Sequence, residues 1–147
     1  MKPVDVTTAI DIARPRQVVA AYATEPDHAA DWYANIERVT WQTNKPLKIG
    51  TRLAFVARFL GRTLTYTYKV IDFIPNERLI MATTEGPFRM ETTYIWSDLS
   101  DQRTHMTLRN RGIPSGFAGV TAPVMVLAMR RANRKDLVAL RSLLERQ

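Results

Sequence analysis

Cysteine is absent from the sequence, and histidine occurs only at positions 28 and 105. A chain without cysteine forms no disulfide bond, has no thiolate nucleophile and cannot build a cysteine-based metal site. His28 and His105 are far apart in the sequence, and neither has neighbours of the kind that bind metals. We therefore expect the protein to hold no metal and no other cofactor.

Long hydrophobic runs are also missing. None approaches the roughly 20 residues that a helix needs to cross a bilayer. The first six residues alternate as a strand does and lack the apolar segment of a secretory signal. These absences favour a cytoplasmic protein. The length of 147 residues fits one domain, 1–147, with a hydrophobic core.

The common catalytic motifs are missing too. The sequence has no phosphate-binding loop and no dinucleotide-binding glycine pattern, and Ser115 lacks the glycine spacing of a nucleophile elbow. A non-enzymatic binding protein is therefore the preferred interpretation, and the sequence leaves enzymatic activity open.

Acidic residues are scarce in the last third of the chain. Residues 1–102 contain 12 Lys/Arg and 12 Asp/Glu, whereas residues 103–147 contain 9 and 2, so the last segment carries the whole net charge of +7. This charge either forms a solvated surface or attracts an anionic membrane or an acidic partner. Aromatic residues do not alternate with the arginines, so we expect no nucleic-acid binding. Contact with a membrane surface stays open.

A long helix is the clearest element that the sequence predicts. The segment 123–146 begins with Pro123, contains no other proline and no glycine, and is dominated by good helix formers. Steps of about 100° place Asn133 and Asp136 inside or beside its apolar face, with Arg134 on the opposite face. The apolar face consists of Met125, Ala128, Met129, Ala132, Ala139, Leu140, Leu143 and Leu144.

The first half of this helix, residues 124–129, is apolar on all sides. A helix of this kind is not expected to be half exposed to water. We predict that residues 112–122 fold over it, or that a second subunit covers Val124 and Leu127 in a homodimer.

The rest of the chain has the two-residue periodicity of strands, interrupted by two short helices. The first strand spans residues 4–12, and the short helices span about 15–22 and 24–35. The later strands span 36–43, 51–59 and 62–73, and three more begin at residues 78, 88 and 103. This order predicts an α+β fold: a six-stranded antiparallel meander, the first strand at an edge, and the long helix laid on the sheet.

The turns between strands determine which side chains point inward. A two-residue turn at Leu60-Gly61 suits a hairpin, and the later turns give a consistent assignment of faces. The predicted cross-strand pairs are Phe59 with Arg62, Phe73 with Arg78, and Glu91 with Arg109.

The inward face is rich in aromatic residues and methionine. These side chains either fill the core or line a cavity between sheet and helix for a small hydrophobic molecule. Because polar groups are few, such a ligand would be neutral or would carry its charge at the cavity mouth. If the protein is an enzyme, cavity tyrosines, His28 or Asp136 are the candidate acid–base groups. The predicted lining residues are Phe55, Tyr66, Tyr68, Met81, Met90, Tyr94, Trp96, Met106, Leu108, Asn110, Met125 and Met129.

Short motifs along the whole chain show a common order and spacing. They are Ile12–Pro15, Trp32, Ile49–Thr51, Gly61-Arg62, Pro75–Leu79, Arg103-Thr104 and Asp136–Arg141. Together they resemble the START-like, or SRPBCC, superfamily, in its polyketide cyclase/dehydrase and lipid-transport branch. The resemblance implies no shared catalytic residues.

The same resemblance implies a helix-grip fold. In this fold a seven-stranded antiparallel curved sheet wraps around a long C-terminal helix, and two short helices lie between strands one and two. It further implies that a cavity between sheet and helix binds or transports a lipid-like or aromatic polyketide-like ligand. The alternative is an enzyme of the cyclase/dehydratase type, as a minority of similar members are.

Overall fold

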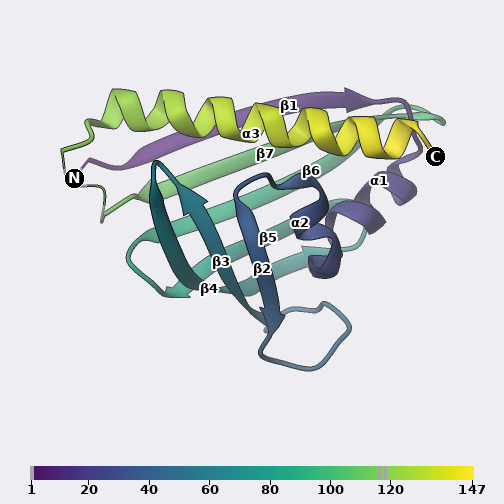
Figure 1. The fold of residues 1–147 in the computed structure, drawn as a ribbon. Coiled ribbons are helices and arrows are strands. Elements are labelled where there is room, and N and C mark those ends of the chain that lie inside the picture. The colour runs from purple at the N-terminus through teal and green to yellow at the C-terminus, as the bar shows by residue number, and fades with distance from the viewer. Residues whose placement is uncertain (1, 116, 118) are drawn as a thin grey trace.

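One antiparallel sheet curls around a long helix in the computed structural model, which describes residues 2–115, 117 and 119–147 (Figure 1). The sheet has seven strands in the order β1-β7-β6-β5-β4-β3-β2. The strands are β1 (Val4–Ile12), β2 (Ile36–Trp41), β3 (Arg52–Phe59), β4 (Arg62–Ile74), β5 (Arg78–Glu85), β6 (Arg89–Ser100) and β7 (Arg103–Ile113). The helices are α1 (Arg16–Ala23), the 3₁₀ turn η1 (Pro26–His28), α2 (Ala29–Trp32) and α3 (Ala122–Glu145). The helix-grip fold with β1 at one edge is confirmed.

The hairpin between β3 and β4 has the predicted register. Phe59 pairs with Arg62. Leu60 and Gly61 form the turn with φ angles of 51° and 76°. Two successive positive φ angles match the twist of the flanking strands, as in the favoured two-residue hairpins.

The predicted pairing of Phe73 with Arg78 is wrong by one residue. Phe73 pairs with Leu79 instead. A bulge between Val70 and Asp72 then restores the original register, in which Val70 pairs with Met81. A bulge adds one residue to one strand, so it shifts the register without moving the rest of the hairpin. Met81 therefore points inward as expected.

The predicted pairing of Glu91 with Arg109 is also wrong. Glu91 lies opposite Arg111, with 3.0 Å between Arg111 Nη2 and Glu91 Oε1. Arg109 instead pairs with Asp5 of β1, at 2.6 Å between Nη2 and Oδ2. The strands continue to Ser100 and Arg103, so the turn comes later than expected. The shift is two residues, which leaves the inward faces of β6 and β7 unchanged.

The second short helix is shorter than predicted. The segment 24–35 forms the turn η1 and the single helical turn α2, and the backbone is extended at Tyr33 (φ −82°, ψ 107°). Pro26 begins the 3₁₀ turn, and so short a segment has little helical stability of its own. The predicted end of β2 at Thr43 is likewise too late, because the strand ends at Trp41.

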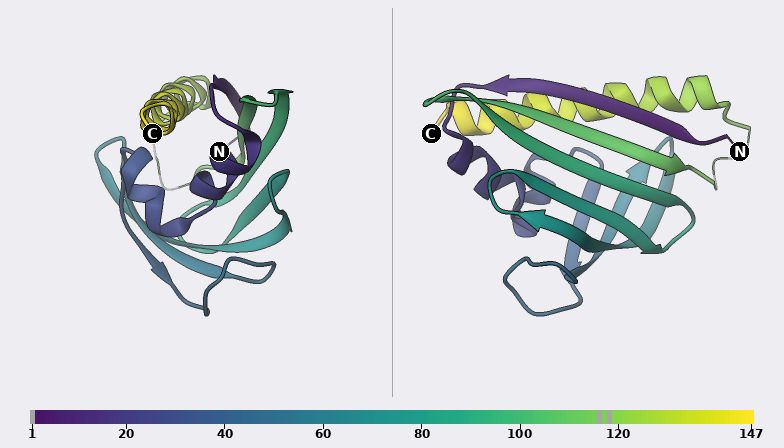
Figure 2. Two further views of the ribbon diagram at one scale, coloured as in Figure 1. Left: turned by 90° about the vertical axis from the view of Figure 1, so that its right-hand side faces the viewer. Right: turned by 180° about the vertical axis from the view of Figure 1, so that it is seen from behind.

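The helix α3 packs along β1 and against α2, and the sheet curves away beneath it (Figure 2). Its buried face includes Met125, Met129 and Leu140. None of the helices in the described part of the chain is long and apolar enough to cross a bilayer.

The connection from β7 to α3 covers only one side of the helix. Phe117 is 5% exposed and packs with Met125 and Met129. Val124 and Leu127 stay 55% and 57% exposed, so the described part of the loop folds over the helix on its inner side alone, and residues 116 and 118 of the predicted loop lie outside the described residues. The inward side of the helix offers the loop an apolar surface that continues the core, whereas the outward side does not. Coverage by a second subunit stays a prediction.

Candidate functional site

A cavity of about 170 Å³, partly open to solvent, lies between the sheet and α3. It separates two clusters of buried side chains. One cluster includes Trp32, Trp96 and Leu140, and the other includes Leu64 and Phe117. The predicted residues that line the cavity are Phe55, Tyr66, Tyr68, Met81, Met90, Tyr94, Asn110, Met125 and Met129.

Three predicted residues do not line the cavity. Trp96, Met106 and Leu108 are 2%, 0% and 0% exposed and belong to the larger core cluster. Alternation along a strand predicts which face a side chain is on. It does not predict where along the strand the sheet and the helix separate to leave a cavity.

Part of the lining comes from segments without a periodic pattern. Tyr33 and Asn35 enter from the connection between α2 and β2, next to Ile36 at the start of β2, and Pro114 and Phe117 enter from the connection between β7 and α3. Sequence reasoning did not assign these residues to the cavity. The one available signal was an aromatic residue, Phe117, in an otherwise small and glycine-rich segment.

Four tyrosines line the cavity, and burial raises the pKa of each phenol. The pKa of Tyr68 rises to about 12, and those of Tyr33, Tyr66 and Tyr94 also rise well above the ordinary value of a phenol. All four hydroxyls are therefore neutral at physiological pH and can donate hydrogen bonds. Tyr33 and Tyr94 hydrogen-bond to each other through their hydroxyl groups.

A second polar group crosses three strands. Thr92 Oγ1 donates to Asn110 Oδ1 over 2.8 Å, and the Tyr68 hydroxyl lies 2.9 Å from the same Thr92 oxygen. A threonine hydroxyl has one proton, so Tyr68 is the donor in its bond with Thr92. The chain Tyr68–Thr92–Asn110 thus holds the Tyr68 ring in place at the cavity wall.

Asp136 is the one carboxylate in the lining. It is 3% exposed, and its Oδ1 accepts a hydrogen bond from the Ala34 amide over 3.1 Å. Burial raises the pKa of this carboxyl to about 6, against smaller lowering effects of the Ala34 hydrogen bond and of the Lys135 charge. No ion pair to it occurs among the described residues.

Asn133 lies one helical turn before Asp136 and lines the same cavity. It is 8% exposed, and its Nδ2 has no hydrogen-bond partner within the part of the chain that the structure describes. A buried amide nitrogen without a partner is costly, so this donor is available to a bound molecule. Asn133 and Asp136 together offer one unused donor and one carboxyl to a ligand.

The two histidines do not take part in this site. His28 stacks on Tyr22, with 4.2 Å between ring centroids, and is absent from the cavity lining, which corrects the expectation that it is an acid–base group there. His105 lies beside Asp11, at 2.6 Å between Nδ1 and Oδ1. No group of three or more His, Asp or Glu side chains able to hold a metal occurs within residues 2–115, 117 and 119–147.

The sequence profile of the family described as "Polyketide cyclase / dehydrase and lipid transport" matches residues 3–145. The chain belongs to this family. The resemblance to the START-like, or SRPBCC, superfamily is thereby confirmed, and members of this polyketide cyclase and lipid-transport family typically bind hydrophobic ligands or act as polyketide cyclases. A search among curated proteins gave no match.

Solved structures similar to this polyketide cyclase and lipid-transport family member come from diverse organisms. The Zhui aromatase/cyclase from Streptomyces sp. R1128 has a TM-score of 0.82 at 18% identity, over 99% of this chain and 95% of the other. A START superfamily protein from Mycobacterium smegmatis has a TM-score of 0.84 at 12% identity, over 97% of each chain. The major latex-like protein 151 from Panax ginseng has a TM-score of 0.74 at 11% identity, over 95% and 96%. At these identities the likeness shows the fold alone.

Proposed function

We propose that the protein binds and carries a small, neutral, hydrophobic molecule in the cavity between the sheet and α3. The observation that supports this function is the cavity of about 170 Å³ itself, walled mainly by aromatic and methionine side chains. Each methylene group that a ligand buries against such a wall contributes about 0.8 kcal/mol. Methionine adapts its shape to different ligands, so the site suits a family of related molecules.

The polar groups of the cavity define the ligand further. Among the described residues the lining contains no lysine or arginine, so a buried anionic group would lack a partner there and would cost several kcal/mol. The Asn133 amide, the Tyr66 hydroxyl and one hydroxyl of the Tyr33–Tyr94 pair can donate to a carbonyl or hydroxyl group, and Asp136 can accept from a hydroxyl group. The ligand is therefore lipid-like or aromatic, with one or two oxygen-containing groups.

Titration with an apolar fluorescent probe tests this function. Ala132 of α3 lines the cavity, whereas Ala128, one turn earlier, does not. Ala132→Phe fills the cavity and should weaken probe binding at least about tenfold, since it removes the space in which apolar contacts form. Ala128→Phe is the matched control and should bind the probe as the parent protein does. Equal binding by both variants would place the probe outside the cavity.

A second candidate function is acid–base catalysis on a polyketide-like substrate, by cyclisation or dehydration. Asp136 favours it, because a carboxyl with a pKa of about 6 is mostly ionised at pH 7 and is still a useful base. In a dehydration, Asp136 would take the proton from the carbon next to a carbonyl. The Asn133 amide would stabilise the enolate oxygen, and a neutral tyrosine would protonate the departing hydroxyl group.

The two candidates differ in the response to Asp136→Asn. If the protein is a carrier, this variant keeps its probe affinity, and neither the parent nor the variant forms a product. For an enzyme, it keeps probe affinity and abolishes product formation from a poly-β-ketone model substrate, as followed by mass spectrometry. Absence of product with the parent protein as well would leave the carrier function.

A further inference from the structure

The outer face of α3 exposes apolar side chains in its first half. Val124 and Leu127 are 55% and 57% exposed, on the side of the helix opposite to the buried Met125 and Met129. The nearby β3–β4 hairpin adds Leu60 at its tip, which is 46% exposed. Exposed aliphatic side chains that lie close together mark candidate interaction surfaces.

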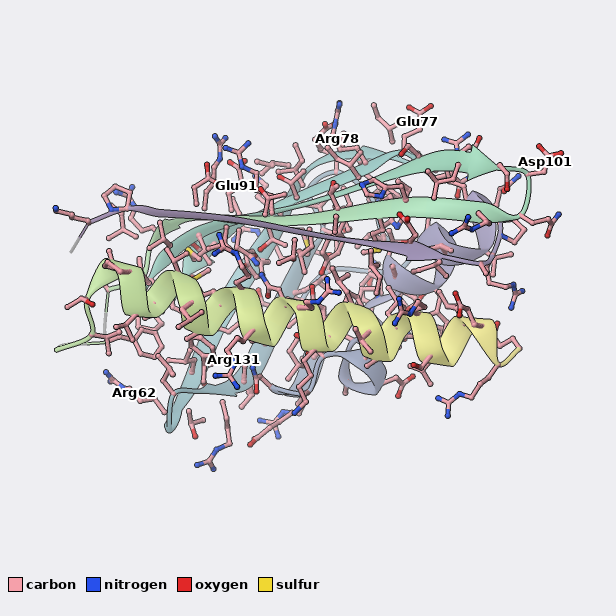
Figure 3. All side chains as sticks on the ribbon, turned by 90° about the horizontal axis from the view of Figure 1, so that it is seen from above. Arg62, Glu77, Arg78, Glu91, Asp101 and Arg131 are labelled. Carbon is pink, nitrogen blue, oxygen red and sulfur yellow. The ribbon has the colours of Figure 1, made fainter. Side chains whose placement is uncertain are left out.

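The hairpin tip and the start of α3 are held together by Phe117. Its ring lies 5.8 Å from the Phe59 ring, and the Arg62 guanidinium carbon lies 5.7 Å from the Phe117 centroid. Phe117 also packs on Met125 of α3. Arg62 and Arg131 project from the same side of the molecule (Figure 3). Helical steps of about 100° place Val124, Leu127 and Arg131 on one face of α3. We call these three residues, together with Leu60 and Arg62 of the hairpin, the docking surface.

The docking surface is basic as well as apolar. Arg62 and Arg131 form no ion pair among the described residues. On the outer face of the sheet, by contrast, Arg109 pairs with Asp5 and Arg111 pairs with Glu91. Arg62 and Arg131 therefore leave their positive charge uncompensated beside the exposed aliphatic side chains.

The cavity reaches the hairpin that carries part of this surface. Phe59 and Leu64, on either side of the hairpin turn, line the cavity, and so does Phe117 beneath Arg62. A molecule that entered or left between the hairpin and α3 would pass the docking surface. The hairpin end of the cavity therefore lies beside the docking surface.

We propose that the docking surface binds an anionic phospholipid bilayer. Leu60, Val124 and Leu127 enter the boundary between headgroups and acyl chains, and Arg62 and Arg131 contact the phosphates. This orientation points the hairpin end of the cavity at the membrane. Membrane docking of this kind is a function beyond ligand binding, because the bilayer is then the surface from which the ligand is collected or to which it is delivered.

Other occupants fit the docking surface less well. A second copy of the chain would bring the unpaired Arg62 and Arg131 groups of both copies together, which like-charge repulsion opposes. A single-stranded nucleic acid needs exposed aromatic rings for stacking, and the large exposed apolar residues of the described chain are all aliphatic. An anionic bilayer satisfies both the charge and the aliphatic side chains.

Vesicle flotation with single-site variants tests the proposal. The parent protein should bind vesicles of phosphatidylcholine mixed with phosphatidylglycerol, bind pure phosphatidylcholine vesicles much more weakly, and lose affinity as salt is raised. Arg131→Glu should weaken binding about fivefold or more. Leu127→Glu should weaken it about tenfold, because the apolar anchor is lost. Both positions are exposed, so thermal unfolding should stay as in the parent.

Matched controls come from the opposite end of the sheet and its outer face. Ile95→Glu changes another exposed aliphatic residue, 45% exposed on β6, and Arg103→Glu changes an exposed arginine at the β6–β7 turn. Both should bind vesicles nearly as well as the parent. All four variants should keep probe affinity in the cavity, so failure of membrane binding and failure of ligand binding are distinguishable.

Three results would overturn the proposal. One is an equal loss of vesicle binding in the control variants, which would mean that binding comes from general charge attraction alone. Another is full vesicle binding by Leu127→Glu. The third is a parent protein that elutes as a dimer in size-exclusion chromatography and becomes monomeric in Leu127→Glu, which would assign the surface to a second copy.

Discussion

Among single residues, Asp136 makes the stability of the fold depend on pH. Burial raises its pKa from 3.8 to about 6, so the folded chain holds this proton more tightly than the unfolded chain does. The favourable contribution is complete below the unfolded pKa and is lost as the pH rises through about 6. At neutral pH the folded protein therefore carries a buried charge that lowers its stability.

Asp136→Asn should remove this dependence. Between pH 5 and pH 8 we expect the parent to lose about 1.4 kcal/mol of unfolding free energy relative to the variant, because about one unit of the pKa difference falls in that range. The asparagine retains an acceptor for the Ala34 amide, so the fold persists. Urea unfolding at the two pH values measures the difference. The same gap between parent and variant at both values would mean that the carboxyl titrates as it does in water.

Thr92 is expected to be the critical residue of the polar chain on the cavity wall. Thr92→Val keeps the shape of the side chain but leaves the Tyr68 hydroxyl and the Asn110 oxygen without their partner. We predict a loss of about 1–3 kcal/mol in unfolding free energy. Thr93→Val is the control, since the neighbouring position points to the other face and should change stability by less than about 0.5 kcal/mol. Similar losses in both variants would point to strand propensity instead.

At the level of elements, the β3–β4 hairpin stores strain at its first turn residue. Leu60 has a φ of 51°, a conformation that costs a leucine roughly 1 kcal/mol and that asparagine adopts readily. Leu60→Asn should therefore raise the unfolding free energy by about 0.5–1 kcal/mol and also weaken vesicle binding. Leu99→Asn, at a residue that is 49% exposed on β6, lacks this strain and should give no gain. Thermal unfolding measures the stability of the two variants, and an equal gain in both would contradict strain at Leu60.

Alternation and turn length explain why most of the sheet could be predicted from the sequence. A two-residue turn set the faces of β3 and β4, and the faces of β6 and β7 survived a register error of two residues. The bulge at Val70–Asp72 could not be predicted, because no residue type in that stretch marks it. The register error is confined to the turn end of the hairpin, because the bulge compensates for the shift.

The candidate site was predictable only where it is built from periodic elements. Tyr66, Met81 and Met129 follow from strand and helix periodicity. Tyr33 and Phe117 come from connections whose path is set by tertiary packing, so their place in the wall had no signature in the sequence. Trp96 was assigned to the wall because it shares the face, but the curvature of the sheet puts it in the core.

At the level of the whole molecule, the cavity divides the core into two clusters, and stability should depend on what fills the space between them. A molecule that binds only the folded state raises the unfolding free energy by an amount set by its concentration and its dissociation constant. At a free concentration of about 100 times that constant, the gain is about 2.7 kcal/mol. For a domain of 147 residues this corresponds to a rise of about 8 °C in the unfolding temperature, at roughly 3 °C per kcal/mol.

We predict this stabilisation for the parent and for Ala128→Phe, and no stabilisation for Ala132→Phe, because the phenyl ring already occupies the space that the probe needs. Without probe, Ala132→Phe should unfold at a temperature equal to or above that of the parent if the ring fits the cavity, since the filled space restores contacts between the clusters. Differential scanning calorimetry with and without probe measures both effects. A probe that stabilises Ala132→Phe as much as the parent would show that the ligand binds elsewhere, and the carrier function would then have no site between the sheet and α3.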